Sequence, residues 1–237
     1  MSAEPVLDVV GLHAAYGSTP VLRGIDMHLG KGEIVSLIGR NGVGKTTTMR
    51  CLIGLVRATA GHIRLRGQAI THLPPADRAR LGIGYIPQGR QVFPRMTVEE
   101  NLRVSQLAGG KSDPQMMERV FAYFPILKER RRQSAGTLSG GEQQQLAIGR
   151  AMVGNPLLLL LDEPSEGIQP SIVRMICEAL KSIRDQLGVT ILFVEQNLDT
   201  IMEISERCYV ADKGTIVAEI GRQELHTSEA VRRHLLI

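Results

Sequence analysis

The chain has 237 residues, of which 43% are hydrophobic and 22% charged, and this length and composition suit a globular protein with a substantial core. Aromatic residues make up 3% of the sequence and tryptophan is absent, which argues against nucleic-acid partners bound by base stacking. The net charge of +4 fits a solvated basic surface or attraction to an acidic partner or membrane face. The three cysteines have no metal-ligand spacing and are typical of core residues in a reducing compartment.

No secretory signal or membrane-spanning segment is predicted. The first residues do not combine a basic end with an apolar stretch. The longest wholly apolar run, Leu157 to Leu161, is far shorter than the ~20 residues of a spanning helix. We therefore expect a cytoplasmic protein that meets a membrane only through a partner.

The first third of the chain shows the alternation of β-strands. Val6, Val10 and Leu12 lie among polar residues, and residues 25–29 alternate strictly, as a half-buried antiparallel strand does. Further strands are predicted at 34–38 and 63–66. Between these two strands, one face of a predicted helix consists of Met49, Leu52, Ile53 and Val56.

From about residue 94 to 155 the alternation disappears and helical spacing replaces it, with breaks at Gly109-Gly110 and Asp113-Pro114. We expect a helical subdomain at 94–155, inserted into a core of residues 1–93 and 156–237, all within one domain of residues 1–237. The apolar positions of this segment are Val98, Leu102, Met116, Val120 and Phe124.

The final third alternates between strands and helices. Residues 157–161 and 189–194 are apolar enough for buried strands, and the apolar positions from Ile172 to Leu187 trace a helix face that ends at Gly188. Residues 209–217 read as a hairpin around a turn at 212–214. Together these features predict an α/β fold with a mostly parallel sheet and an antiparallel β part near the N-terminus.

A glycine-rich loop between the strand at 34–38 and the following helix fits the phosphate-binding pattern of P-loop NTPases. Its glycines let backbone N–H groups point at phosphate oxygens, to which the helix adds its positive end. Lys45 would reach the β- and γ-phosphates of ATP, and the Thr46 hydroxyl would hold Mg²⁺. The predicted loop consists of Gly39, Arg40, Asn41, Gly42, Val43, Gly44, Lys45, Thr46 and Thr47.

Two adjacent carboxylates, Asp162 and Glu163, follow the apolar strand at 157–161. They therefore emerge at the carboxyl edge of the sheet, where ligands bind in such folds. Asp162 would bind Mg²⁺ directly or through water, and Glu163 would orient or deprotonate the water that attacks the γ-phosphate. The alternative is that the pair only caps a helix.

A second anion site is indicated by Ser139, Gly140, Gly141 and Glu142. The two glycines expose N–H groups at a helix N-terminus, and Ser139 with Glu142 fits a capping box. In combination with the phosphate loop and the acidic pair, the segment resembles the signature of the ATP-binding cassette (ABC) ATPases. The resemblance covers nearly the whole chain and implies a P-loop NTPase (RecA-like) fold.

In that family the signature serine and glycines of one subunit close on the ATP of another, so the resemblance implies a dimer. It also implies that Tyr16 stacks on adenine, although a core tyrosine at a strand end is an alternative. Gln88 matches the glutamine that reaches Mg²⁺ and the attacking water. Residues 166–170 match a segment that contacts the dimer partner.

One position departs from the family pattern. Most members carry a histidine on the γ-phosphate where this chain has Gln196. An amide can still donate a hydrogen bond, but it carries no charge and does not titrate near neutrality. Gln196 is therefore either a working substitute or the mark of a slow accessory site.

Gln196, residues 39–48, Pro87-Gln88-Gly89-Arg90 and Val92-Phe93-Pro94 are similar to the second ATP-binding subunit of bacterial importers for branched-chain amino acids, urea and short-chain amides. Residues 165–170 favour the urea and amide branch. The resemblance implies a different ATP-binding subunit as partner (a homodimer being possible in isolation), membrane-spanning permease subunits and, indirectly, a periplasmic solute-binding protein. It places the chain on the inner face of the membrane, with a short helix of a permease received in the cleft beside Gln88. The alternatives are a soluble ABC ATPase not coupled to transport and a low-turnover nucleotide-binding accessory subunit.

Overall fold

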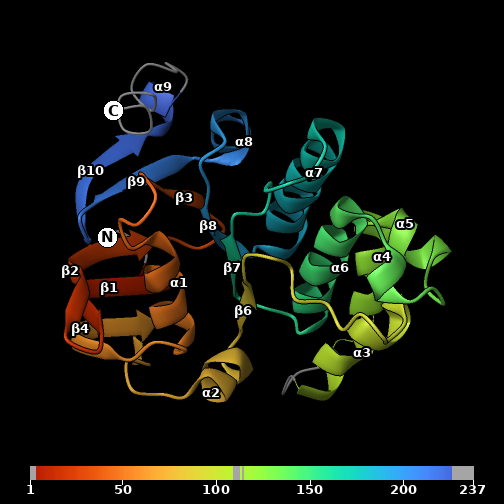
Figure 1. Ribbon diagram of the computed structural model, residues 1–237, viewed down its shortest axis with the longest axis horizontal. Coiled ribbons are helices and arrows are strands. Elements are labelled where there is room, and N and C mark those ends of the chain that lie inside the picture. Colours follow the sequence, from red (N-terminus) through yellow and green to blue (C-terminus); the bar gives the residue numbers. More distant parts are fainter. Residues whose placement is uncertain (1–3, 109–112, 114, 226–237) are drawn as a thin grey trace.

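The computed structural model describes residues 4–108, 113 and 115–225. Two sheets organise the chain, with a group of helices beside them (Figure 1). The strands are β1 (Leu7–Tyr16), β2 (Thr19–Leu29), β3 (Ile34–Ile38), β4 (Ala58–Leu65), β5 (Gln68–Ala69), β6 (Ile83–Ile86), β7 (Leu158–Asp162), β8 (Thr190–Val194), β9 (Arg207–Asp212) and β10 (Thr215–Gly221). The helices are α1 (Lys45–Ile53), α2 (Pro75–Arg80), α3 (Val98–Ala108), α4 (Met116–Tyr123), α5 (Pro125–Glu129), η1 (Ala135–Thr137), α6 (Gly140–Val153), α7 (Pro170–Leu187), α8 (Leu198–Ile204) and α9 (Arg222–Leu225).

The larger sheet has the strand order β10-β9-β3-β8-β7-β6. Its strands are parallel except for the predicted β9–β10 hairpin. Asp212 pairs with Thr215 and ends β9, so it is not part of the turn as predicted. Strands β3, β7 and β8 are buried along their whole length, which explains their nearly continuous apolar sequences. Because these three are adjacent and parallel, the loops that follow them meet at one edge of the sheet.

The smaller sheet, β2-β1-β4-β5, is antiparallel. Its strand β2 has the predicted alternation at residues 25–29, with the apolar side chains buried and the polar ones exposed. Val10 is an exception to the predicted pattern, because it is 50% exposed. A register shift between Val9 and Leu12, with Gly11 at φ 57°, reverses the facing of the side chains there.

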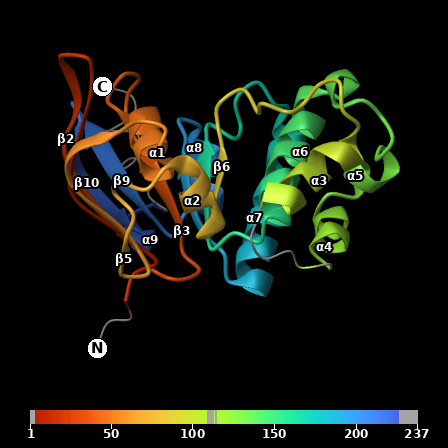
Figure 2. The same ribbon diagram turned by 90° about the horizontal axis from the view of Figure 1, so that it is seen from below.

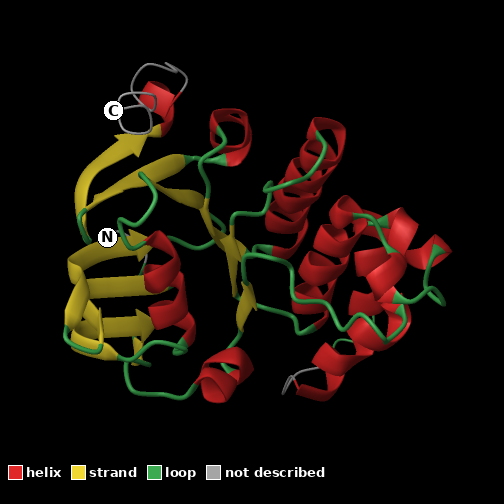
Figure 3. Ribbon diagram, in the orientation of Figure 1, coloured by secondary structure: helices red, strands yellow, loops and turns green. Residues whose placement is uncertain are grey.

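The elements between β6 and β7 in the described part of the chain are helices joined by loops, with one isolated bridge between Thr97 and Ser134. These helices lie to one side of both sheets (Figures 2 and 3). The inserted helical subdomain is therefore confirmed as a feature of the fold, whereas its boundaries at 94 and 155 stay a prediction. The predicted break at Gly109-Gly110 and Pro114 lies outside the described residues. No helix in the described part of the chain has the length and apolarity needed to cross a membrane.

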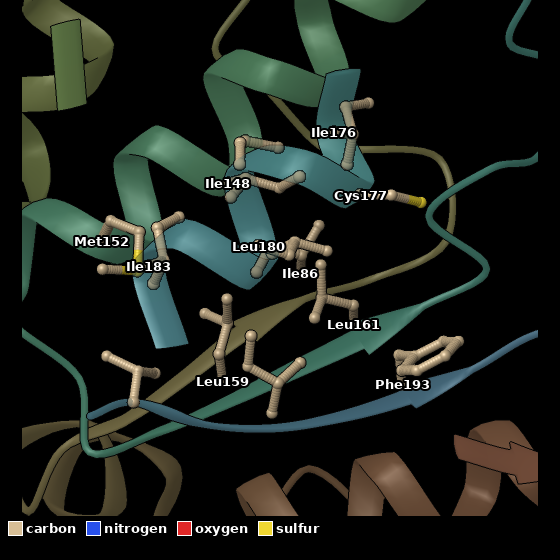
Figure 4. Packing of buried hydrophobic residues seen from close by; sticks show 14 of the residues in the cluster. Ile86, Ile148, Met152, Leu159, Leu161, Ile176, Cys177, Leu180, Ile183 and Phe193 are labelled. Atoms are coloured by element: carbon tan, nitrogen blue, oxygen red, sulfur yellow. The ribbon is translucent and has the colours of Figure 1, made fainter. Parts of the chain in front are cut away.

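A hydrophobic cluster joins the helical subdomain to the larger sheet. Side chains of α6 and α7 pack against β6, β7 and β8 (Figure 4). Within α7 the helix begins at Pro170, two residues before the predicted face, and Gly188 ends it with φ 66°. Helix α1 is shorter than its predicted face: Gly54 at φ 86° ends it, so Val56 lies beyond the helix. The three cysteines, Cys51, Cys177 and Cys208, are free and buried.

Candidate functional site

The phosphate loop joins the buried strand β3 to α1 and depends on glycine at two positions. Gly39 has φ 144°, and a Cβ atom there would lie 2.3 Å from the carbonyl oxygen of Ala211. Gly44 has φ 108° and precedes α1 without a side-chain cap. The first N–H groups of α1 are thus free of a capping side chain, as an anion site at a helix N-terminus requires.

Lys45 lies inside this loop and is only 5% exposed. Its Nζ donates to the carbonyl oxygens of Gly39 at 2.7 Å and Arg40 at 2.8 Å. Burial lowers the pKa of Lys45, and the nearby carboxylates of Glu163 and Asp162 act in the opposite direction. A phosphate bound in the loop would offer this ammonium group a charged partner in place of two carbonyls.

Thr46 and Asp162 meet at the base of the site. The hydroxyl of Thr46 donates to Oδ1 of Asp162 at 3.1 Å. Asp162 is 2% exposed, and its Oδ2 is buried without a hydrogen-bond partner among the described residues. Burial raises the pKa of Asp162, while the hydrogen bond from Thr46 lowers it. A carboxylate oxygen and a hydroxyl beside a phosphate loop fit the oxygen ligands that Mg²⁺ prefers.

Glu163 is held on both sides of its carboxylate. Gln196 donates from Nε2 to Oε1 at 2.7 Å, and Gln88 donates from Nε2 to Oε2 at 3.1 Å. The backbone of Glu163 has φ 51°, and its N–H donates to the carbonyl of Val194 at 3.0 Å. A left-handed glutamate is uncommon, and such strain occurs at functional sites. The structure therefore brings together three residues that lie far apart in the sequence.

Gln88 has a second carboxylate partner, Glu166, whose Oε2 accepts from Nε2 at 3.0 Å. The guanidinium group of Arg90 donates to the carbonyl of Glu166 at 3.0 Å. The segment after the acidic pair is thus tied to the loop that follows β6.

Half of the predicted site residues line one cavity of about 400 Å³. It is lined by Val21, Asn41, Gly42, Gly44, Lys45, Thr46, Thr47, Gln88, Glu163, Glu166 and Gln196. A second cavity, of about 690 Å³, is lined by Gly39, Arg40, Asn41, Gly42, Val43, Gln196, Leu198, Asp212 and Lys213. The phosphate loop therefore lines two cavities.

The signature segment lies elsewhere, at the N-terminus of α6. Ser139 caps this helix, and Glu142 completes the predicted capping box. The carboxylate of Glu142 also pairs with Arg130 at 3.2 Å. A Cβ atom on Gly140 would lie 2.6 Å from the guanidinium group of Arg90, so the loop after β6 reaches this helix too. Ser139, Gly140 and Gly141 do not line either cavity at the phosphate loop.

Tyr16 is the last residue of β1 and is 47% exposed, so the alternative of a core tyrosine does not apply. A side-chain hydrogen bond with Tyr16 is the largest cause of the raised pKa of Arg50, on the outer face of α1. Tyr16 does not line either of the two cavities, and its stacking on adenine stays a prediction.

The sequence did not predict the contacts of three residues at the site. Arg90 and Glu166 join the loop after β6 to the segment after the acidic pair, and the third residue is Glu195. Glu195 directly follows the apolar strand β8, just as the acidic pair follows β7. That position was a usable signal, because adjacent parallel strands end at the same edge of the sheet.

The chain is similar to known proteins over most of its length. Residues 22–166 match the family model described as "ABC transporter". The chain is 45% identical to the high-affinity branched-chain amino acid transport ATP-binding protein BraG of Pseudomonas aeruginosa, over 92% of this chain and 93% of BraG. It is 37% identical to a probable branched-chain amino acid transport ATP-binding protein LivF of Archaeoglobus fulgidus, over 93% and 94% of the two chains. The ADP conformation of MJ1267, an ATP-binding cassette of an ABC transporter, superposes with a TM-score of 0.83 and 28% identity, covering 94% of each chain.

Proposed function

Since the chain belongs to the ABC transporter family, we propose that it powers a bacterial importer for branched-chain amino acids or for urea and short-chain amides. The family establishes that the chain binds ATP and is an ATPase. The single observation that carries the proposed mechanism is the carboxylate of Glu163, held by Gln88 and Gln196 in the cavity that also contains Lys45. The relatives named for branched-chain amino acid transport support the solute class.

ATP binding uses the phosphate loop. The N–H groups of residues 39–44 and of the first turn of α1 would surround the β- and γ-phosphates. Lys45 would exchange its bonds to the carbonyls of Gly39 and Arg40 for bonds to phosphate oxygens. Tyr16 would stack on the adenine.

Thr46, Asp162 and Gln88 would hold the Mg²⁺ that accompanies ATP. The unpartnered buried oxygen of Asp162 and the adjacent hydroxyl of Thr46 support this assignment. When bound, the ion neutralises charge on the β- and γ-phosphates.

Glu163 would orient the attacking water and accept its proton. The hydrogen bonds from Gln88 and Gln196 fix the direction of its carboxylate. A fixed general base lowers the activation free energy more than a mobile one does, because it does not have to be reoriented during the reaction. Gln196 lines both cavities around the loop, so its amide would donate to the γ-phosphate from the same position.

Function also requires a second ATP-binding subunit. Ser139, Gly140 and Gly141 lie at the N-terminus of a different helix from the phosphate loop and face neither of its cavities. We propose that they bind the ATP of a partner subunit, which is a different chain in the assembled importer. Closing this dimer would move the permease subunits, and hydrolysis would reset them.

The contact with a permease would lie where the helical subdomain meets the larger sheet. A cavity of about 170 Å³ is lined there by residues of β6, α3 and α6, among them Tyr85, Ser105 and Arg150. The Arg150 guanidinium lies 5.0 Å from the ring centre of Phe93, which is 43% exposed, and donates to Gln91 at 2.8 Å. Gln88, beside which the docking cleft was predicted, follows β6 but does not line this cavity. We propose that a short cytoplasmic helix of the permease docks at the cavity next to that predicted cleft, which would place the chain on the inner face of the membrane.

The test is to reconstitute the chain with the permease subunits and the second ATP-binding subunit of its importer, and to measure ATP hydrolysis and uptake of radiolabelled leucine and urea. Glu163→Gln should retain ATP binding and lower turnover by about 10²-fold or more, since a general base contributes this much. It should also stabilise an ATP-bound dimer, detected by light scattering. Unchanged turnover in Glu163→Gln would contradict the mechanism, and uptake of neither solute would contradict the transport proposal.

A further inference from the structure

Glu195 is a buried carboxylate that binds only backbone amides in the described hydrogen-bond network. It follows β8 directly and is 3% exposed. Its Oε1 accepts from the N–H groups of Gln196 at 2.9 Å and Asn197 at 3.1 Å, and its Oε2 accepts from the N–H of Ser165 at 3.2 Å. No lysine or arginine of the described chain forms an ion pair with it. Three amide donors thus compensate for the burial of this carboxylate.

The three amides belong to two segments that flank Glu163. Gln196 donates from its side chain to Oε1 of Glu163 at 2.7 Å. Ser165 lies two residues after Glu163 and one before Glu166. The carboxylates of Glu163 and Glu166 both accept a hydrogen bond from the side chain of Gln88. Glu195 therefore joins the residues on both sides of the carboxylate proposed to act on water.

We propose that Glu195 is a positioning residue for ATP hydrolysis, which sets the placement of Gln196 relative to Glu163 by tying residues 163–166 to residues 195–197. This inference rests on the role proposed above for Glu163. Glu195 itself lines neither of the cavities at the phosphate loop, so it acts through other residues.

Two substitutions separate this role from a general contribution to folding. Glu195→Asp keeps the negative charge, which also helps to raise the pKa of Lys45. The aspartate side chain is one methylene shorter, so it should still reach the N–H groups of Gln196 and Asn197. It should lose the hydrogen bond from the N–H of Ser165, which lies on the other segment. Glu195→Gln keeps the length, but its NH₂ group faces an N–H donor and at least one contact is lost.

The experiment measures kcat and KM for ATP in the reconstituted complex, per ATP-binding site, together with the thermal stability of the full-length chain. Both variants should lower kcat by about tenfold or more, because a small misplacement of reacting groups has effects of this size. The KM for ATP should stay within about twofold, because the phosphate loop is untouched. Glu203→Gln is the control: this glutamate of α8 pairs with Lys181 at the surface, and its loss should leave kcat unchanged.

A kcat in Glu195→Asp and Glu195→Gln equal to that of the wild type would overturn the inference. So would a rise in KM with unchanged kcat, or a loss of turnover that only follows a loss of folded chain. Glu163→Gln is measured in parallel. If that variant keeps full turnover, the proposed function itself fails; if it loses turnover while the Glu195 variants do not, only the present inference fails.

Discussion

Replacing Gln196 by alanine tests whether the amide at this position takes the place of a histidine. In the structure Gln196 donates from Nε2 to Oε1 of Glu163 at 2.7 Å. The substitution removes that donor and leaves the backbone N–H of residue 196 free to keep its bond to Glu195. The loss is therefore confined to the side chain.

The expected magnitude follows from the type of bond that is lost. A hydrogen bond to a charged group contributes about 1.5–3 kcal/mol. Gln196 is exposed, so water partly replaces its amide and the lower end of this range applies. About 1.5 kcal/mol in the activation free energy corresponds to a decrease in kcat of about tenfold.

The assay is steady-state phosphate release by the assembled complex at saturating ATP and Mg²⁺, with ATP affinity measured separately. Asn197→Ser is the matched control, because the Asn197 side chain caps α8 and serine preserves a cap. Its turnover should equal that of the wild type. If Gln196→Ala kept its turnover within twofold, Gln196 would have no role at Glu163 or the γ-phosphate, and the reasoning from its contact would be wrong.

Three further predictions concern metal binding and stability. Asp162→Asn should weaken Mg²⁺-dependent ATP binding by at least about tenfold in a fluorescent-nucleotide titration, because it removes the negative charge beside Thr46 that fits a divalent ion. Equal ATP affinity in the variant and the wild type would contradict the proposed Mg²⁺ site. Arg78→Ala should lower the free energy of unfolding by about 3–5 kcal/mol in a urea titration. This arginine of α2 is 2% exposed, and its guanidinium group donates to two backbone carbonyls of α1 and two in the loop before α2. A loss below 1 kcal/mol would refute the prediction. Burial acts to raise the pKa of Glu33, but hydrogen bonds from Arg207 and the N–H of Gly30 outweigh burial and hold this pKa below its ordinary 4.5. The ionised Glu33 therefore contributes to stability above pH 4.5, and this contribution is lost as the pH falls through the pKa of the folded state. The difference in melting temperature between Glu33→Gln and the wild type should accordingly be present at pH 7 and shrink in acid, and a difference independent of pH would refute it.

Local patterns in the sequence predicted those parts of the fold that depend on neighbouring residues. The apolar face of α7 and its end at Gly188 follow from helical spacing and from the conformational freedom of glycine. The capping box of Ser139 and Glu142 likewise lies within one helical turn. Helix α2 was not predicted, because its six residues contain too few apolar positions to show a period.

Features that depend on residues distant in the sequence could not be predicted. The outward position of Val10 results from a bulge against the partner strand, and alternation alone does not show it. In the site, the motifs identified Glu163 and Gln88 separately, but their contact joins segments 75 residues apart. The sequence shows that the carboxylate of Glu195 lies at the end of a strand. It does not show that this carboxylate binds the amide of Ser165, which is 30 residues away.

The burial of all three cysteines has a practical consequence for labelling. Burial raises the pKa of the thiols of Cys51, Cys177 and Cys208 to about 12, so the reactive thiolate is scarce at neutral pH. A maleimide dye or spin probe would therefore attach selectively to one newly introduced surface cysteine, such as Glu129→Cys on the exposed side of α5, without removal of the native ones. Approach of that label to a second one on a companion subunit would report dimer closure directly, by energy transfer or spin–spin distance.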